Sequence, residues 1–88
     1  NVSIWEFDDS DILIYPNPVK DELNIEVIQN KYIDDEFMIK IFDYNAKVVK
    51  KELFRKQINI NRNSLVPGVY FLFISSKNKS YNTKILFE

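Results

Sequence analysis

Apolar and polar residues alternate along the chain in short runs, which Asn, Asp, Pro and Gly separate. No segment keeps a helical period of about 3.6 residues over three turns, so the pattern predicts strands. Seven short strands with turn signals about every 8–12 residues are typical of an all-β, immunoglobulin-like antiparallel sandwich, and this is the fold we expect. The expected strands span residues 12–15, 22–28, 37–42, 47–54, 58–60, 69–75 and 81–87.

The alternation also predicts which side chains are buried. In a half-buried strand every second residue faces the core, and a slip of one residue would turn the whole set to solvent. Leu65 lies outside the strands and is expected to plug the space under the turn that follows it. Residues 1–11 have no clear place in the pattern and are predicted to be a linker or N-terminal extension of a domain at 12–88. The predicted core consists of Leu23, Ile25, Ile39, Ile41, Leu65, Tyr70, Leu72 and Ile74.

Three turns carry specific predictions. The segment 16–18, Pro-Asn-Pro, ends the first strand, because proline removes a ladder donor and restricts the residue before it. The Asn17 side chain is expected to cap this bend. In the hairpin at 43–46, Asn45 is expected to take the left-handed conformation. Pro-Gly at 67–68 suits the central pair of a type II turn, whose second residue needs a positive φ.

Composition limits the chemistry of the chain. Its 88 residues suffice for one domain. Without cysteine or histidine, no thiolate or imidazole can bind a metal. Twelve basic residues against 13 acidic residues give a net charge of −1, which does not favour nucleic-acid binding. No apolar run reaches the roughly 20 residues of a membrane-spanning helix.

Acidic residues cluster in two places, Asp8-Asp9-Asp11 and Asp34-Asp35-Glu36. Calcium takes such carboxylates, but neither cluster has the alternating spacing or the glycine of a calcium loop, so solvated loops are expected instead. A carboxylate pair for glycoside hydrolysis would need a cleft that a domain this small rarely offers. We therefore predict a non-enzymatic domain with no metal or cofactor.

Three segments resemble the type A C-terminal sorting domains of the type IX (Por) secretion system in Bacteroidetes. The family's opening motif is matched by Ile14-Tyr15-Pro16-Asn17-Pro18 and then Leu23-Asn24-Ile25, and its central hairpin resembles residues 41–49, with Ala46 where the family usually has glycine. Its closing motif is matched by Leu65-Val66-Pro67-Gly68-Val69-Tyr70 and by Lys84-Ile85-Leu86. Carried over residue by residue, the sorting motif consists of Tyr15, Pro16, Asn17, Pro18, Leu65, Gly68, Tyr70, Lys84, Ile85 and Leu86.

The resemblance implies a sorting signal. Such a domain is covalently linked to an upstream cargo, folds in the periplasm, and is read by the outer-membrane translocon. A sortase-like peptidase at the cell surface then usually removes it, and the cargo is released or stays attached to the surface. The first ten residues carry acids and no signal-peptide pattern, so entry into the periplasm is expected to be specified upstream.

Within this reading, the last hairpin, 68–88, is predicted to carry the sorting information. Strand-edge pairing would give affinity, and the alternate side chains Ile85 and Phe87, with the charge of Lys84, would give selectivity. The alternative is that the last strand only completes the sandwich. Tyr70 is expected to be structural, with its ring inside and its hydroxyl bonded to a nearby carbonyl.

Two other functions fit the composition. A carbohydrate-binding module would need an aligned aromatic row on one sheet face, for which the scattered Trp5, Tyr32, Tyr44 and Tyr81 are candidates. An adhesion or spacer module would more often occur in tandem copies. Free sheet edges invite association, which Lys77, Lys79 and Lys84 would discourage, so a monomer or weak dimer is expected.

Overall fold

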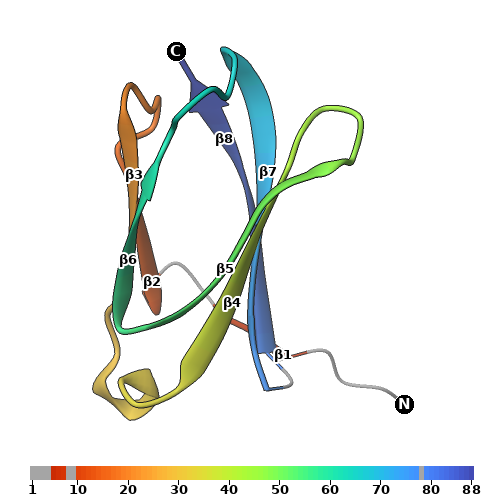
Figure 1. Cartoon of the computed structure of the whole chain (residues 1–88). Coiled ribbons are helices and arrows are strands. Elements are labelled where there is room, and N and C mark those ends of the chain that lie inside the picture. The colour runs from red at the N-terminus through yellow and green to blue at the C-terminus, as the bar shows by residue number, and fades with distance from the viewer. Residues whose placement is uncertain (1–4, 8–9, 78) are drawn as a thin grey trace.

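The computed structural model describes residues 5–7, 10–77 and 79–88. Within this part, eight strands form two sheets that lie face to face, and the only helical segment is the three-residue 3-10 helix η1 (Asn30–Tyr32) (Figure 1). The strands are β1 (Trp5–Glu6), β2 (Ile12–Tyr15), β3 (Glu22–Val27), β4 (Glu36–Phe42), β5 (Val48–Arg55), β6 (Gln57–Asn61), β7 (Gly68–Ser76) and β8 (Lys79–Phe87).

The larger sheet has the order β1-β8-β7-β4-β5 and the smaller sheet the order β2-β3-β6. All neighbours are antiparallel except the two-residue β1, which runs parallel to β8. The predicted all-β sandwich of seven strands is confirmed, with β1 as a short addition. Each predicted strand agrees with the observed one to within two residues at either end.

The core forms where the inward positions of the two sheets meet. Seven of the eight predicted core residues are buried, and Leu65 is half-buried against the core. At one end of the sandwich the core is aromatic: the Phe37 ring stacks on Phe54 with centroids 5.5 Å apart. The Phe7 ring meets Tyr32 edge-on at 5.0 Å and lies 5.5 Å from Phe37.

The N-terminal segment contributes to this core. The Phe7 side chain is 3% exposed, and its N–H donates to the Ser80 carbonyl oxygen at 2.8 Å. β1 pairs with β8 immediately before it. Residues 5–7 therefore pack on the sandwich, whereas the division into an N-terminal extension and a domain that starts at residue 12 stays a prediction.

The hairpin between β4 and β5 corrects one prediction. Ala46, not Asn45, has the positive φ, at 67°. The Asp43 carboxylate accepts hydrogen bonds from the N–H groups of Asn45 at 2.8 Å and Lys47 at 3.0 Å. This Asx-type arrangement fixes Asn45, so the left-handed residue of the turn is the one that follows it.

The type II turn predicted at Pro67-Gly68 is also wrong. The chain reverses earlier, where Leu65 N–H donates to the Arg62 carbonyl oxygen at 3.1 Å and Asn63 has a φ of 54°. Gly68 has a φ of 148°, far from the roughly +80° of a type II turn, and it begins β7 opposite Phe87. Its missing Cβ is still needed, because few other residues adopt this backbone conformation.

Candidate functional site

The opening and closing motifs meet at one corner of the sandwich. Val19, directly after Pro-Asn-Pro, forms a parallel bridge with Phe87 near the end of β8. Its N–H donates to the Leu86 carbonyl oxygen at 2.8 Å, and its carbonyl oxygen accepts the Glu88 N–H at 2.8 Å. Both bridged side chains are at most 1% exposed. The segment after the opening motif is thus a short parallel addition to the outer edge of β8.

Asn17 strengthens this connection. Its side-chain Oδ1 accepts the N–H of Leu86 at 3.2 Å. The expected strand exit at 16–18 is confirmed, since β2 ends at Tyr15. The expected cap on its own bend is wrong, because the side chain satisfies a donor of β8, 69 residues away in sequence.

Tyr70 and Arg62 surround the Phe87 ring at the same corner. The Tyr70 side chain is 4% exposed, its centroid lies 4.8 Å from that of Phe87, and its hydroxyl donates to the Val66 carbonyl oxygen at 2.7 Å, as predicted. The Arg62 guanidinium lies 5.7 Å from the Phe87 ring. It donates to the carbonyl oxygens of Leu65 at 2.9 Å and Lys20 at 2.8 Å. We call this corner the junction; it consists of Asn17, Val19, Arg62, Tyr70, Leu86 and Phe87.

Sequence reasoning did not identify Val19, Arg62 and Phe87 as parts of a joined structure. Val19 had a usable signal, being an apolar residue isolated between proline and two charges. The sequence around Arg62 gave no such signal, because Arg62 binds main-chain carbonyl oxygens and every residue type has a main-chain carbonyl. Phe87 was identified, but its predicted role was wrong.

The predicted sorting residues of β8 have side chains on two opposite faces of the strand. Ile85 and Phe87 are 2% and 1% exposed. They face the core because strand residues alternate between faces, so the prediction that they give selectivity at the surface is wrong. Lys84 and Leu86 are exposed, and they remain available to a partner.

The remaining motif residues are divided between the junction and other places. Leu65 and Gly68 lead into β7 beside the junction, and Pro16 and Pro18 are exposed on either side of Asn17. Tyr15 lies apart. Its hydroxyl donates to the Glu26 carboxylate, and this hydrogen bond is the main cause that raises the pKa of Tyr15.

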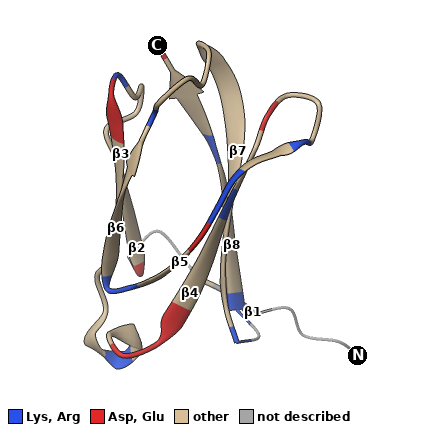
Figure 2. Cartoon of the chain, viewed as in Figure 1, with Lys and Arg blue, Asp and Glu red and all other residues tan. Residues whose placement is uncertain are grey.

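An apolar groove of about 510 Å³ lies on the outer face of the larger sheet. Phe42 and Phe71 are direct cross-strand neighbours there, with Phe73 alongside and Lys40 and Lys84 at the groove. Figure 2 shows basic segments on β5 and β8 of this sheet.

The aromatic residues proposed as a sugar platform do not line up. Tyr32 is buried, Tyr81 packs against the core, and Tyr44 is 82% exposed in the β4–β5 hairpin. The side chain of Trp5 lies outside the described residues. The aromatic row of this domain is instead the phenylalanine groove, which the sequence analysis missed because these residues share a face only across strands.

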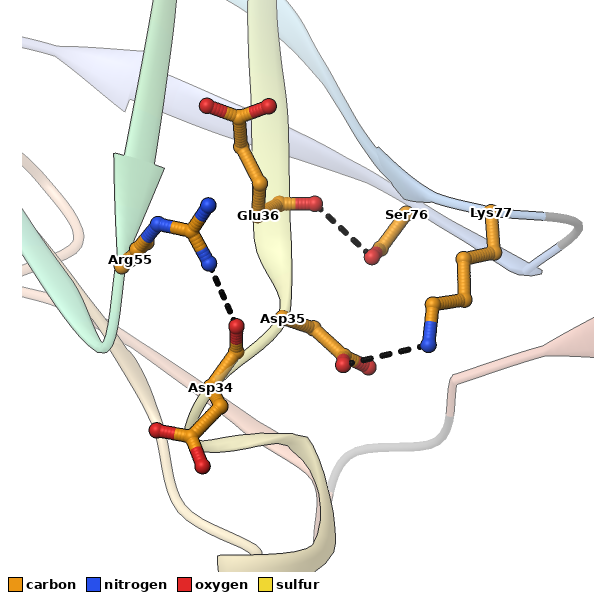
Figure 3. Close-up of polar contacts among 6 residues, drawn as sticks. All are labelled: Asp34, Asp35, Glu36, Arg55, Ser76 and Lys77. Atoms are coloured by element: carbon orange, nitrogen blue, oxygen red, sulfur yellow. Dashed lines mark hydrogen bonds and ion pairs between the residues drawn. The ribbon is translucent and has the colours of Figure 1, made fainter.

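The acidic segment 34–36 ties the η1–β4 connection to its neighbours. Asp35 pairs with Lys77 at 3.3 Å, the Glu36 carbonyl oxygen accepts the Ser76 hydroxyl at 2.8 Å, and Arg55 donates to the Asp34 carbonyl oxygen. The three carboxylates point in different directions (Figure 3). Across the described residues, no group of three or more Asp, Glu, His or Cys side chains is placed to share a metal ion. Asp8 and Asp9 of the other acidic cluster lie outside the description.

Comparison with known families identifies the domain. A family model for the secretion system C-terminal sorting domain matches residues 13–88. The chain therefore belongs to this family, the sorting domains of type IX secretion. Domains of this family are non-catalytic in general, and they imply a linked cargo that is exported across the outer membrane. No curated protein matches the chain. Among the described residues no helix is long and apolar enough to cross a bilayer.

Proposed function

We propose that this domain directs a covalently linked upstream cargo from the periplasm to the cell surface or medium, through direct contact with the type IX translocon. The observation that carries the proposal is the family match over residues 13–88. The junction supports it, because it joins the opening and closing motifs of that family into one corner of the fold.

In this proposal the domain is a non-enzymatic signal. The translocon recognises the exposed surface of the last hairpin, residues 68–88, in which Lys84 and Leu86 point outward. A sortase-like surface peptidase then removes the domain, and the cargo is released or attached. A monomer or weak dimer in solution stays our prediction.

The proposal is tested with a periplasmic reporter fused upstream of residues 1–88. We expect this fusion to reach the surface of a type IX-competent host and to stay in the periplasm of the same host without its translocon. Surface reporter is expected to be shorter than the fusion by up to the 10.5 kDa of the domain. A reporter that stays in the periplasm of both strains, or reaches the surface of both, would contradict the proposal.

Carbohydrate binding is the second candidate, and the groove over Phe42, Phe71 and Phe73 favours it. Aromatic walls with a few polar groups are typical of small-ligand sites. For this function we expect the 88-residue domain to bind members of a glycan array, and Phe71→Ser to abolish binding, with the exposed Lys20→Ser as a control. Absence of binding by the parent domain would eliminate this candidate.

A further inference from the structure

The outer edge of β8 is defined by which main-chain groups face away from β7. The Ser80 and Leu86 carbonyl oxygens accept hydrogen bonds from Phe7 and Val19, which lie on that outer side. In an antiparallel pair, alternate residues direct both main-chain groups away from the partner strand. The β7–β8 register runs without irregularity from Lys79 to Phe87. The main-chain N–H and C=O groups of the even-numbered residues of β8 therefore point away from β7, toward the outer edge of the sheet.

Asn82 and Lys84 lie between the two occupied ends of this edge. Among the described residues, no strand pairs with them on the outer side. The Lys84 carbonyl oxygen has a 3.5 Å contact from the neighbouring Thr83 hydroxyl. From Ser80 to Leu86 the edge spans about 20 Å, at about 3.3 Å per residue. The described residues of β8 include no proline or bulge, which are common means of protecting a strand edge.

A groove of about 340 Å³ runs beside this edge, between β8 of the larger sheet and β2 of the smaller sheet. Ile12 and Ile14 of β2 line one wall, and Tyr81 and Ile85 of β8 line the other. Among the described residues of the lining, Lys84 is the only charged one. Within the part of the chain that the structure describes, the site thus offers unpaired main-chain groups, a groove of mixed polarity on one side and the positive charge of Lys84 on the outer face of the sheet.

We propose that the β8 edge at Asn82 and Lys84 binds an extended segment of the export machinery as an added parallel strand, with a carboxylate side chain against Lys84. This inference rests on the proposed function. The strand runs parallel because both segments already on this edge, β1 and Val19, are parallel to β8. The carboxylate is assigned from the charge of Lys84.

The proposed hydrogen bonds between the added strand and β8 have the same pattern as those that Val19 makes with β8. Val19 donates to the Leu86 carbonyl oxygen and accepts the Glu88 N–H. A partner residue opposite Thr83 donates its N–H to the Asn82 carbonyl oxygen and accepts the N–H of Lys84. Alternate side chains of the added strand enter the groove, which is how strand addition combines main-chain affinity with side-chain selectivity.

A proline substitution tests this geometry. Asn82→Pro places a pyrrolidine ring on the outer edge, next to the Asn82 carbonyl oxygen that the added strand would use, and it breaks no β7–β8 hydrogen bond, so the domain is expected to stay folded. Asn59→Pro is the matched control. Asn59 lies on the edge strand β6, and the bond from Val27 N–H to the Lys56 carbonyl oxygen shows by the same alternation that its N–H faces outward.

Each variant is fused to the reporter, and the surface fraction is measured together with the thermal unfolding of the free domain. We expect Asn82→Pro to fold but to lose export by at least about tenfold, the equivalent of one lost binding contact. Asn59→Pro is expected to fold and to export as the parent does. Asn82→Ala, which adds no ring at the edge, is expected to export far better than Asn82→Pro.

The outcomes separate the two proposals. If the parent fusion and Asn82→Pro are exported equally, the strand-addition proposal fails and the sorting function stands. Equal loss in Asn82→Ala and Asn82→Pro would assign the effect to the side chain and also overturn strand addition. Unfolding of Asn82→Pro beside a folded Asn59→Pro would mean that the amide is paired inside the domain, with the same consequence. Failure of the parent fusion to be exported would reject the sorting function itself.

Discussion

Truncation of the chain after Lys84 is expected to unfold the domain rather than only to remove a recognition element. The truncation deletes Ile85 and Phe87, which are 2% and 1% exposed. Removing a buried isoleucine costs about 2–5 kcal/mol and a buried phenylalanine about 3–5 kcal/mol. A domain of this length has roughly 4–13 kcal/mol of stability in total, a range comparable with the combined loss, and the truncation also removes the hydrogen bonds of Val19 with Leu86 and Glu88. Circular dichroism during urea denaturation would show no cooperative transition.

Adjacent point variants provide the control for this prediction. Phe87→Ala is expected to lower the free energy of unfolding by about 3–5 kcal/mol, because the Phe87 ring packs on Tyr70 inside the junction. Leu86→Ala, one residue away with a side chain 42% exposed, is expected to cost about 1 kcal/mol or less. A truncated domain that unfolds cooperatively at the parent's urea concentration would contradict the placement of β8 in the core. Loss of export on truncation therefore does not by itself demonstrate recognition of the C-terminal strand.

Lys84→Ala, unlike the truncation, is expected to leave the domain folded and still to reduce export of the cargo. The Lys84 side chain is exposed and lies opposite Phe71 on the outer face of the larger sheet. A surface substitution of this kind changes stability by about 0.5 kcal/mol or less. In our account Lys84 also provides the charge next to the strand-binding edge. Loss of roughly 1.4 kcal/mol of binding would lower export about tenfold where recognition limits the rate.

The strands and most of the core could be predicted from the sequence because their signal is local. Leu23 and Ile25, or Ile39 and Ile41, are two residues apart and bury the same face of one strand. Phe7 gave no such signal, since it packs against Tyr32 and Phe37 from a segment with only two residues of strand.

The joined arrangement of the sorting motif could not be predicted because it depends on contacts between distant segments. Asn17 looked like the cap of its own turn, yet its acceptor serves Leu86 at the other end of the chain. A pattern of residue types also does not say which residue of a turn takes the strained conformation. In the 43–46 turn this was decided by the Asp43 carboxylate, which holds Asn45 and leaves the positive φ to Ala46.

The central claim is that the exposed side of β8 carries the sorting information, separately from its role in completing the sandwich. The most direct measurement is the surface fraction of the reporter fusion carrying Lys84→Ala, compared with Lys51→Ala, which removes another exposed lysine charge, from β5. Protease resistance of both variants would establish that they fold. The account predicts a surface fraction about tenfold lower for Lys84→Ala alone, equivalent to one lost charged contact. Equal export of two folded variants would contradict it.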